Sequence, residues 1–473
     1  MMSMTRSMTT AFHPQTARPV PFGTLWRYGM GQVGGQVFRD APATLLPIFM
    51  TTMLGVPPWI AGLAIIIPKL WLILCDPLVG ALSDRFKVRF GRTPFLAVGA
   101  VVTSIGFAIL FSLRGFSTPE LAAAAVSVVF LIASTGFSAF SVPYLALASE
   151  ISDDAHERSR LLASRIMGSI VGVIAGIGLA QPVIVALGGG AAAWRTAGLL
   201  LAGLCLVTML VTALTMHRRA ERTATVEQQE GLFVHILHAL REKDFRWLTL
   251  TYLLQCTAQG CSFTVVAFVF LYCVGNVNLI LPFVLIMSVA NLVGQPIWLA
   301  LARRWGAVTC FLVANIGYIT ISISAFWITP GDDVLVTLPV IGALSTNQTI
   351  VLLRALPLAF FNGGFLLLIL SMFTDVVNRV KKRGDGAVNE GVYSGIFTAT
   401  EKLSFAIAPM IGGVVLSMSG FAASTGGAHA QGSQALTGIL AMYALIPAAI
   451  MVLSLATFWV FLKRSPHEAR SGR

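Results

Sequence analysis

The sequence predicts an all-α polytopic membrane protein with twelve transmembrane helices arranged as two six-helix bundles. Of its 473 residues, 56% are hydrophobic and only 11% are charged, and the mean hydropathy is +0.81. Apolar runs of about 20 residues, long enough to cross ~30 Å of hydrocarbon as a helix, recur along the chain. The alternating pattern typical of a membrane β-barrel is absent.

The apolar runs define twelve expected spans and one long polar interruption. The spans are 23–53, 57–82, 94–113, 119–148, 161–187, 193–216, 247–274, 278–302, 307–328, 350–378, 392–420 and 437–462. Tails 1–22 and 463–473 flank two six-helix bundles, 23–216 and 247–462, which a central loop, 217–246, connects. The first tail lacks the apolar region of a cleavable signal peptide, so the first span is expected to direct insertion.

The central loop carries five apolar residues at helical spacing, a pattern typical of a short interfacial helix. They are Leu232, Phe233, Ile236, Leu237 and Leu240. A regulatory partner could dock there, but a plain linker between two halves is the favoured interpretation.

Lys and Arg residues gather in alternate loops. One set comprises Arg6, Arg18, Arg85, Lys87, Arg89, Arg92, Arg158, Arg160, Arg165, the cluster from Arg218 to Arg246, Arg303, Arg304, Arg379, Lys381, Lys382, Arg383 and the tail from Lys463. The opposite loops hold little beyond Arg114 and Arg195. Because basic loops stay in the cytoplasm, both termini are predicted to be cytoplasmic and the protein to lie in the cytoplasmic (inner) membrane. The net charge of +12 therefore reflects orientation and does not predict nucleic-acid binding.

The six cysteines fall in apolar segments without C-x-x-C spacing. We interpret them as small buried residues, neither disulfides nor metal ligands. The sequence contains no G-x-S-x-G, H-E-x-x-H or nucleotide-binding motif. An enzyme, a resident metal and a cofactor are therefore not expected.

The two halves look like copies of one unit. An offset of 219 residues aligns Asp76-Pro77-Leu78 with Gln295-Pro296-Ile297, Ala81-Leu82 with Ala300-Leu301, Arg85-Phe86 with Arg304-Trp305, Gln36 with Gln255, and Asp40 with Gln259. Such duplication is a feature of secondary transporters, whose binding sites lie between the repeats. The acid at Asp76 survives in only one copy.

Polar residues share one face of span 1, namely Gln32, Gln36, Arg39 and Asp40. Span 7 carries the matching stripe Tyr252, Gln255, Gln259 and Ser262. A charged side chain at the centre of a spanning helix costs roughly 2.5 to 3.5 kcal/mol, so such residues pair or line a wet cavity. We favour a substrate cavity between the halves over the alternative, interhelical hydrogen bonds that hold the bundle together.

Asp76 lies within span 2, seven residues after Lys69 and on the same helix face. Lys402 in span 11 is the second candidate partner. A carboxylate with a switchable cationic partner could load a proton or cation on one side and release it on the other. We therefore predict a cation-coupling site of Asp76, Lys69 and Lys402, with a permanent structural salt bridge as the alternative.

The segment after Asp76 reads Gly80, Asp84, Arg85 and then Arg92, and we interpret it as a loop. Gly80 would permit close helix approach, and the charges would form gating pairs that break as the halves rock. The positive-inside rule alone would also place bases here, but the G-x3-D-R spacing followed by G-R is more specific. Close packing is also predicted for the glycines of span 5, Gly168, Gly172 and Gly176.

The motif from Asp76 to Arg92, D-P-x-x-G-x3-D-R followed by G-R, resembles the second-helix signature of the major facilitator superfamily. More narrowly, it is similar to the glycoside-pentoside-hexuronide:cation symporter branch, the melibiose-permease-like carriers. A second stretch, from Thr374 to Lys402, is similar to helices X and XI of that branch. The resemblance implies the major-facilitator fold, alternating access and ion coupling, with Asp76 as the cation-site carboxylate and Lys402 as the lysine of helix XI.

Some positions depart from the branch. Sodium-coupled members carry a second acid where this chain has Leu72, and the sugar-contacting acids of helices I and IV align with Gln36 and Ser141. Sodium prefers several oxygen ligands, so proton coupling or weak coupling is favoured over sodium. Arg39 beside Asp40 would suit an anionic or zwitterionic solute.

We expect a monomeric secondary active transporter that moves a small solute by alternating access, coupled to a proton or another monovalent cation. The solute would be sugar-like or glycoside-like, or another polar or anionic metabolite. In this scheme Tyr144 and Glu401 join the substrate cavity, and Asp375 joins the gating residues. The alternatives are a lysolipid or amphiphile carrier of the same fold, and a non-transporting membrane sensor or assembly factor.

Overall fold

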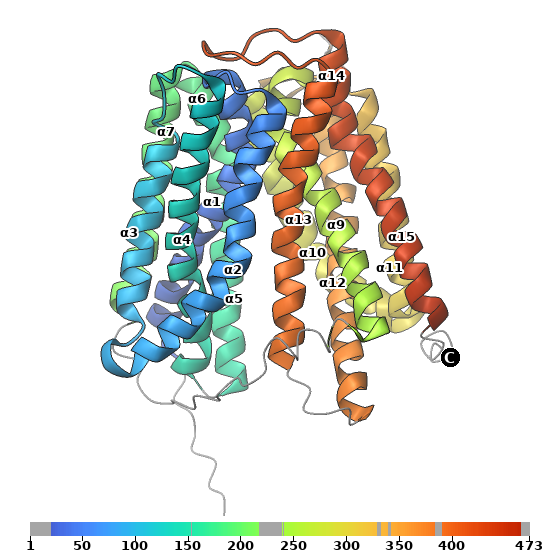
Figure 1. Ribbon diagram of the computed structural model, residues 1–473. Helices are drawn as coiled ribbons and strands as arrows, with labels where there is room; N and C mark the ends of the chain where they lie inside the picture. The colour runs from blue at the N-terminus through green and yellow to red at the C-terminus, as the bar shows by residue number, and fades with distance from the viewer. Residues whose placement is uncertain are drawn as a thin grey trace, which may run out of the picture.

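The computed structural model describes residues 20–152, 154–216, 239, 241–328, 333–338, 342–383 and 390–464. Two groups of long helices stand side by side (Figure 1). Within the described ranges, the strands are β1 (Val334–Leu338) and β2 (Gly342–Ser345), which form an antiparallel hairpin with Leu338 opposite Gly342. The hairpin lies in a connection that the sequence left unassigned.

The first half contains six spans, one of which changes helix type within the membrane. Its elements are α1 (Phe22–Met53), α2 (Pro58–Phe90), α3 (Thr93–Leu110), α4 (Pro119–Ile151), α5 (Ala155–Val173), a π-helical turn (Ile174–Leu179), α6 (Ala180–Ala186) and α7 (Ala191–Thr215). Together α5, the π-helical turn and α6 make up the fifth span.

The second half repeats this plan. Its elements are α9 (Lys243–Phe268), a π-helical turn (Val269–Cys273), a 3-10 turn (Val277–Leu279), α10 (Ile280–Trp305), α11 (Ala307–Ile323), a 3-10 turn (Ser324–Trp327), α12 (Thr346–Arg383), α13 (Glu390–Met418), α14 (Ser433–Leu440), a π-helical turn (Ala441–Leu445) and α15 (Ile446–Arg464). In Figure 1, α1 begins and α15 ends at the lower end of the molecule.

Eleven helical stretches in the described ranges are long and apolar enough to cross a membrane. The twelfth expected span, α1, is more polar, and every residue from Ala41 to Met53 is buried. The other helices therefore shield α1 from lipid, which explains how it can carry a polar stripe. The all-α fold of twelve spans is confirmed.

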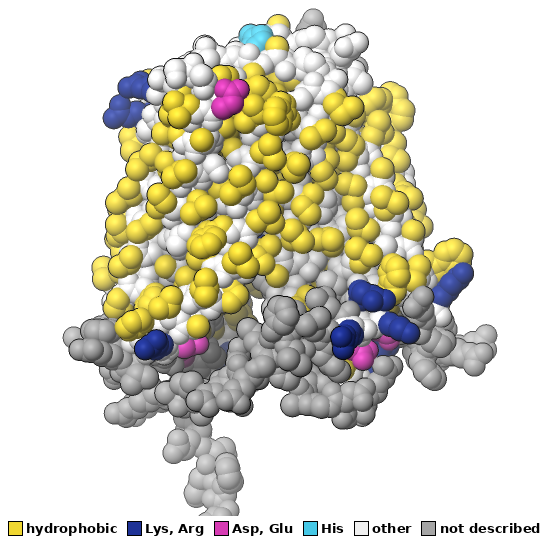
Figure 2. All heavy atoms as spheres, in the orientation of Figure 1, with side chains coloured by type: hydrophobic (Ala, Val, Ile, Leu, Met, Phe, Trp, Pro, Cys, Tyr) yellow, Lys and Arg dark blue, Asp and Glu magenta, His cyan; other side chains and the backbone are white. Residues whose placement is uncertain are grey.

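The outer wall of the bundle is apolar. On α3, Val98, Val101, Ile105 and Ile109 follow each other at three- and four-residue spacing and are all exposed. Figure 2 shows a hydrophobic wall on the face toward the viewer, with the visible Lys and Arg side chains at its two rims. This distribution is that of a multi-pass membrane protein.

The predicted loop after span 2 is wrong. Helix α2 continues to Phe90, so Asp84 and Arg85 lie on its last turns. No Gly or Pro interrupts the helix between Asp84 and Gly91, which adopts a φ of 68° and ends it.

Several helices begin earlier than predicted, including α12 at Thr346 and α14 at Ser433. Helix α5 begins at Ala155 because the Asp154 side chain caps it by accepting a hydrogen bond from the Glu157 amide at 2.9 Å. Helix α9 begins at Lys243 rather than residue 247. The interfacial helix predicted in the central loop lies outside the described residues.

The glycines of span 5 pack against α1 as predicted. A Cβ atom on Gly172 would lie 2.7 Å from the Val33 carbonyl oxygen, and one on Gly176 would lie 3.3 Å from the Val37 Cα. All six cysteines are free and buried, as the sequence indicated.

The two halves are joined at the end opposite the start of α1. The Gly55 amide donates to the Ser424 carbonyl at 2.9 Å, and the Ser424 amide donates to the Thr51 carbonyl at 2.8 Å. The Trp59 amide donates to Ser417 Oγ at 3.1 Å, which ties α2 to α13. This end of the interface is therefore closed.

Candidate functional site

Six charged side chains meet between the halves, near the middle of α1, α2 and α13. We call them the interface charge cluster: Arg39, Asp40, Lys69, Asp76, Glu401 and Lys402. It contains three cations and three carboxylates from both halves of the chain. The sequence nominated all six residues, and the structure brings them together.

Two consecutive residues of α13 bind two different helices of the first half. Glu401 forms an ion pair with Arg39 on α1, and Lys402 forms one with Asp76 on α2. Consecutive helical residues point about 100° apart, so α13 can reach both neighbours at one level. The halves are thus linked by two ion pairs in the middle of the membrane-spanning region.

Asp76 is bound on both carboxylate oxygens. Its Oδ2 pairs with Lys402, and its Oδ1 accepts a hydrogen bond of 2.5 Å from Ser138 Oγ on α4. Ser138 is fully buried, which makes it a fixed donor to the carboxylate. Of the two lysines that the sequence offered as partners of Asp76, the structure pairs Lys402 with it.

Lys69 takes a different position from the one predicted for a direct partner of Asp76. Its Nζ donates to the backbone carbonyl oxygen of Phe405 on α13 at 3.1 Å. Lys69 therefore also connects the halves, but through a neutral acceptor. Lys402 and Arg39 each hold a carboxylate partner, whereas Lys69 holds none among the described residues.

The polar stripe of α1 forms a hydrogen-bonded relay. Arg165 Nε on α5 donates to Gln32 Oε1 at 2.8 Å, and Gln32 Nε2 donates to Gln36 Oε1 at 3.0 Å. Gln36 Nε2 donates to Asp40 Oδ2 at 2.6 Å, and Arg39 lies 3.8 Å from the other Asp40 oxygen. The relay extends from Arg165 to the interface charge cluster.

Part of the cluster is accessible to water. The Arg39 side chain is 48% exposed and that of Lys402 36%. The neighbouring residues of α1, Val37, Phe38 and 41–53, are buried against other helices. The exposed part of Arg39 therefore faces the space between the halves. The Arg39 guanidinium also lies 5.8 Å from the centre of the Phe405 ring. Charged and aromatic side chains are therefore combined with solvent-exposed surface at this position.

Other residues predicted to line the cavity lie inside one half. Tyr144 is 2% exposed, donates to the Tyr28 carbonyl at 2.8 Å and stacks on the Tyr28 ring. Gln255 is fully buried and donates to Asn315 Oδ1 at 2.8 Å, and Gln259 donates to Asn362 at 2.5 Å. These three side chains hold helices together within a half here, and their contact with a solute stays a prediction.

Arg92 forms the charge network at the lower end of the first half. It donates to Asp84 at 2.6 Å, to Glu150 at 2.8 Å and to Ser83 Oγ at 2.9 Å. Arg92 is buried, and the network joins the end of α2, the start of α3 and the end of α4. The partners all belong to one half, whereas the ion pairs of the interface charge cluster connect the two halves in the described part of the chain.

The remaining predicted gating residues are less constrained. Arg85 on α2 and Asp375 on α12 are exposed. A Cβ on Gly80 would meet only Val142 Cγ1, at 3.6 Å, an ordinary contact. The close helix approach predicted at Gly80 is therefore absent in this conformation.

Three polar residues of the site were missed in the sequence. No sequence pattern around Ser138 or Glu150 indicates a role, because their partners, Asp76 and Arg92, are distant in the chain. Arg165 was assigned to a loop, although it lies on the face of the span 5 glycines, three residues before Gly168. That spacing could have placed it against α1.

Two helical bundles with charged side chains at their interface are typical of membrane carriers. The sequence model of the family described as "MFS/sugar transport protein" matches residues 27–462. The chain therefore belongs to this family, which consists of transporters and not enzymes.

The relatives agree with this assignment. The chain is 27% identical over 428 residues to the "Putative glycoside/cation symporter YagG" of Escherichia coli, covering 89% of this chain and 87% of that one. It is 28% identical over 165 residues to the "Uncharacterized symporter sll1374" of Synechocystis, but this match spans only 34% of this chain and 30% of the relative. The nucleoside transporter NupG has a similar fold, with a TM-score of 0.63 and 13% identity over 92% of this chain and 99% of the other.

Proposed function

We propose that this protein is a cation-coupled symporter of the cytoplasmic membrane that moves a small polar solute by alternating access. The solute is sugar-like or glycoside-like, or another polar or anionic metabolite. The main support for the proposal comes from two ion pairs that cross the interface between the halves. Asp76 pairs with Lys402, and Arg39 pairs with Glu401. Both must break before the halves can separate on this face.

The coupling step follows from the surroundings of Asp76. A proton on this carboxylate would remove its attraction for Lys402, so protonation would release α13 from α2. The oxygen ligands that sodium needs are sparse, since Leu72 and Cys75 supply none and Ser138 offers one hydroxyl. A proton is therefore the favoured coupling ion.

The solute site would lie beside the coupling site. Arg39 and Glu401 are partly exposed, and the Gln32 and Gln36 amides continue the polar surface along α1. A polar solute that replaced the Arg39–Glu401 contact would open the second link between the halves. Because Lys69 donates to a carbonyl acceptor, an anionic group of the solute would find a cation there.

Purified protein in liposomes would test the proposal. A panel of labelled glycosides, sugar acids and neutral sugars would be offered under an imposed proton gradient, and separately under a sodium gradient. We expect accumulation of at least one solute with the proton gradient, and loss of accumulation but not of exchange in Asp76→Asn. Accumulation by Asp76→Asn equal to that of the unchanged protein would refute the coupling role.

The same assay separates a transporter from a non-transporting sensor or assembly factor. Such a protein would tolerate the combined change of Gln32, Gln36 and Arg39 to neutral apolar residues with its cellular role intact. A transporter would lose uptake. The partly exposed position of Arg39 between the halves favours the transporter.

A further inference from the structure

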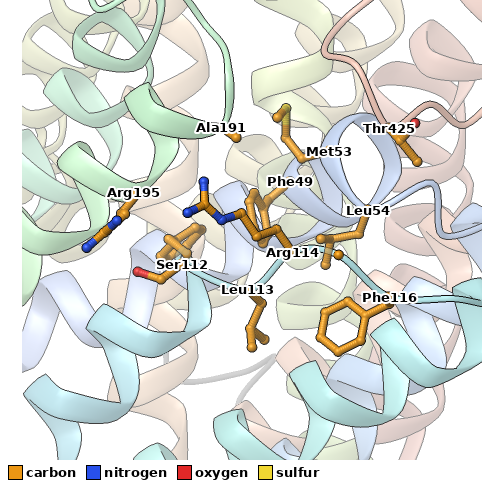
Figure 3. A pocket seen from close by; sticks show the side chains of 12 residues that line it. Phe49, Met53, Leu54, Ser112, Leu113, Arg114, Phe116, Ala191, Arg195 and Thr425 are labelled. Carbon is orange, nitrogen blue, oxygen red and sulfur yellow. The ribbon is translucent and has the colours of Figure 1, made fainter.

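A cavity of about 340 Å³ lies at the closed end of the molecule, away from the interface charge cluster. It is bounded by the ends of α1, α3 and α7, by the connection between α3 and α4, and by one residue of the connection between α13 and α14. The basic-residue pattern predicts that this end is extracytoplasmic. Figure 3 shows the side chains that line the cavity.

Two arginines line this cavity, Arg114 and Arg195, at the end of the molecule opposite the basic loops. Arg114 extends across the cavity toward the side of α7, where Arg195 is found (Figure 3). Within the described part of the chain, neither guanidinium has an ion-pair partner. Two unpaired cations in one cavity repel each other, and an anion between them would remove the repulsion. Arginine binds phosphate well because its planar fork donates two parallel hydrogen bonds.

Apolar side chains predominate in the rest of the cavity, beside the hydroxyl groups of Ser112 and Thr425. Phe49 and Phe111 are each 2% exposed, and Phe116 also lines the cavity. Phe49 and Phe111 lie 5.4 Å apart between ring centres. A ligand that fills the cavity therefore needs an anionic part beside the arginines and an apolar part beside the rings.

The outer face of α7 leads to this cavity. Arg195 is exposed, and Leu199, one turn after it, begins an exposed apolar stripe that continues with Val207 and Leu214. An acyl chain lying along this stripe would bring its headgroup to the level of the cavity. This continuity favours a membrane lipid over a water-soluble anion.

We propose that the cavity binds the headgroup of an anionic phospholipid from the leaflet at this end, with its phosphate between Arg114 and Arg195. Thr425 also lines the cavity, and it belongs to the second half, next to the Ser424 that is bonded to Thr51. The lipid would therefore contact both halves while this end is closed. Its binding would stabilise the closed end and so regulate the transport cycle.

Native mass spectrometry of the full-length protein in detergent would measure the binding of phosphatidylglycerol. The double variant Arg114→Gln with Arg195→Gln should bind at least about tenfold more weakly, because both charge-assisted contacts are lost. The matched control is Arg303→Gln with Arg304→Gln, two exposed arginines at the opposite rim, and it should keep the affinity of the unchanged protein. The variant Arg114→Lys with Arg195→Lys should retain part of it.

Three outcomes would overturn the proposal. Equal lipid binding by the Arg114 and Arg195 double variant and by the control would show that the cavity is not the site. Equal binding of diacylglycerol would remove the role of the phosphate. Saturation by inorganic phosphate alone, with no gain in affinity from acyl chains, would show a soluble anion site instead.

A separate measurement tests whether lipid binding stabilises the closed end. Spin labels at Ala192→Cys and Gly426→Cys, both exposed and on opposite halves, report the separation of the halves at this end. Phosphatidylglycerol should shift the distance distribution toward its short component, and the Arg114 and Arg195 double variant should not respond. A distribution that lipid leaves unchanged in the unaltered protein would contradict the link between the halves.

Discussion

Lys402 on α13 pairs with Asp76 on α2, so one ion pair connects the two halves through the carboxylate that the sequence marked as the coupling site. Asp76 also accepts the Ser138 hydrogen bond from α4, which fixes it to its own half. When the carboxylate is protonated, the bond within the half can remain while the link between the halves is weakened. The same residue can thus bind the ion and control the contact.

The first prediction concerns the energy of this pair. Asp76→Asn and Lys402→Gln should each lower the unfolding free energy by about 1 to 2 kcal/mol, because each leaves one charge unpaired between the halves. The estimate is below that for a fully buried pair, since the Lys402 side chain is 36% exposed. The double variant should lose less than the sum, with a coupling of about 1 kcal/mol. Chemical unfolding in detergent measures all three; strictly additive losses would contradict a direct pair.

The second prediction separates function from stability at Arg39. This side chain is 48% exposed, so Arg39→Gln should cost less than about 1 kcal/mol in unfolding free energy. Uptake should nevertheless fall at least about tenfold, because the variant removes both the proposed solute contact and the link to Glu401. The exchanged variant Arg39→Glu with Glu401→Arg should recover part of the uptake. Full uptake by Arg39→Gln would exclude it from the solute site.

Much of this arrangement could be predicted from the sequence, because membrane helices show two clear patterns: helical periodicity and isolated charges in apolar spans. Periodicity placed the polar stripe of α1 on one face, and the spacing of Gly168, Gly172 and Gly176 indicated close packing. Isolated charges in apolar spans identified both members of the Asp76 and Lys402 pair. Each of these signals is local, or depends on the high cost of a charge in lipid.

The missed features depend on contacts between distant segments. Ser138 on α4 has a role only because the packing of α2 places Asp76 beside it. In the same way, Glu150 has a role only because Arg92 lies next to it. Hydropathy also ended span 2 at residue 82, because it measures the apolar core and not the helix, which continues beyond the lipid to Phe90. The helical spacing of Gln255 predicted a residue that lines the cavity. Its side chain instead donates a hydrogen bond to Asn315 within the second half.

The third prediction tests the Arg92 network. Arg92→Gln should lower the unfolding free energy by about 3 kcal/mol, because the Glu150 side chain is only 9% exposed, Ser83 is buried, and both lose this charged donor. Arg85→Gln is the matched control, since Arg85 is an exposed arginine on the adjacent helix and its replacement should change the unfolding free energy by less than about 0.5 kcal/mol. Similar losses for the two variants would show that the network adds little to stability.

The fourth prediction compares two glycines. Gly172→Ala places a Cβ 2.6 Å from the Cβ of Gln36, so α5 must move away from α1, at a cost of about 1 to 3 kcal/mol. Gly80→Ala meets only Val142, at 3.6 Å, and should leave the unfolding free energy within about 0.5 kcal/mol.

Gly80→Ala also tests the predicted gating role. If the helices approach Gly80 closely in the other conformation, uptake should fall at least about fivefold although stability is unchanged. Uptake equal to that of the unchanged protein would remove Gly80 from the gating residues. Thermal unfolding and liposome uptake on the same preparations keep the two effects separate.

The last prediction concerns the closed end, where α2 and α13 meet. The Trp59 amide donates to Ser417 Oγ at 3.1 Å, so cysteines at these two positions lie within reach of a short bifunctional thiol reagent. Alternating access requires this end to open, and cross-linking Trp59→Cys with Ser417→Cys should therefore reduce uptake to below about a tenth. The six native cysteines are buried, so the reaction at other sites should be slow. Each single cysteine variant should keep its uptake after the same treatment, and a reducible reagent should allow recovery on reduction. Continued uptake by the fully cross-linked protein would mean that this contact stays in place during transport, and the halves would then have to move about a different axis.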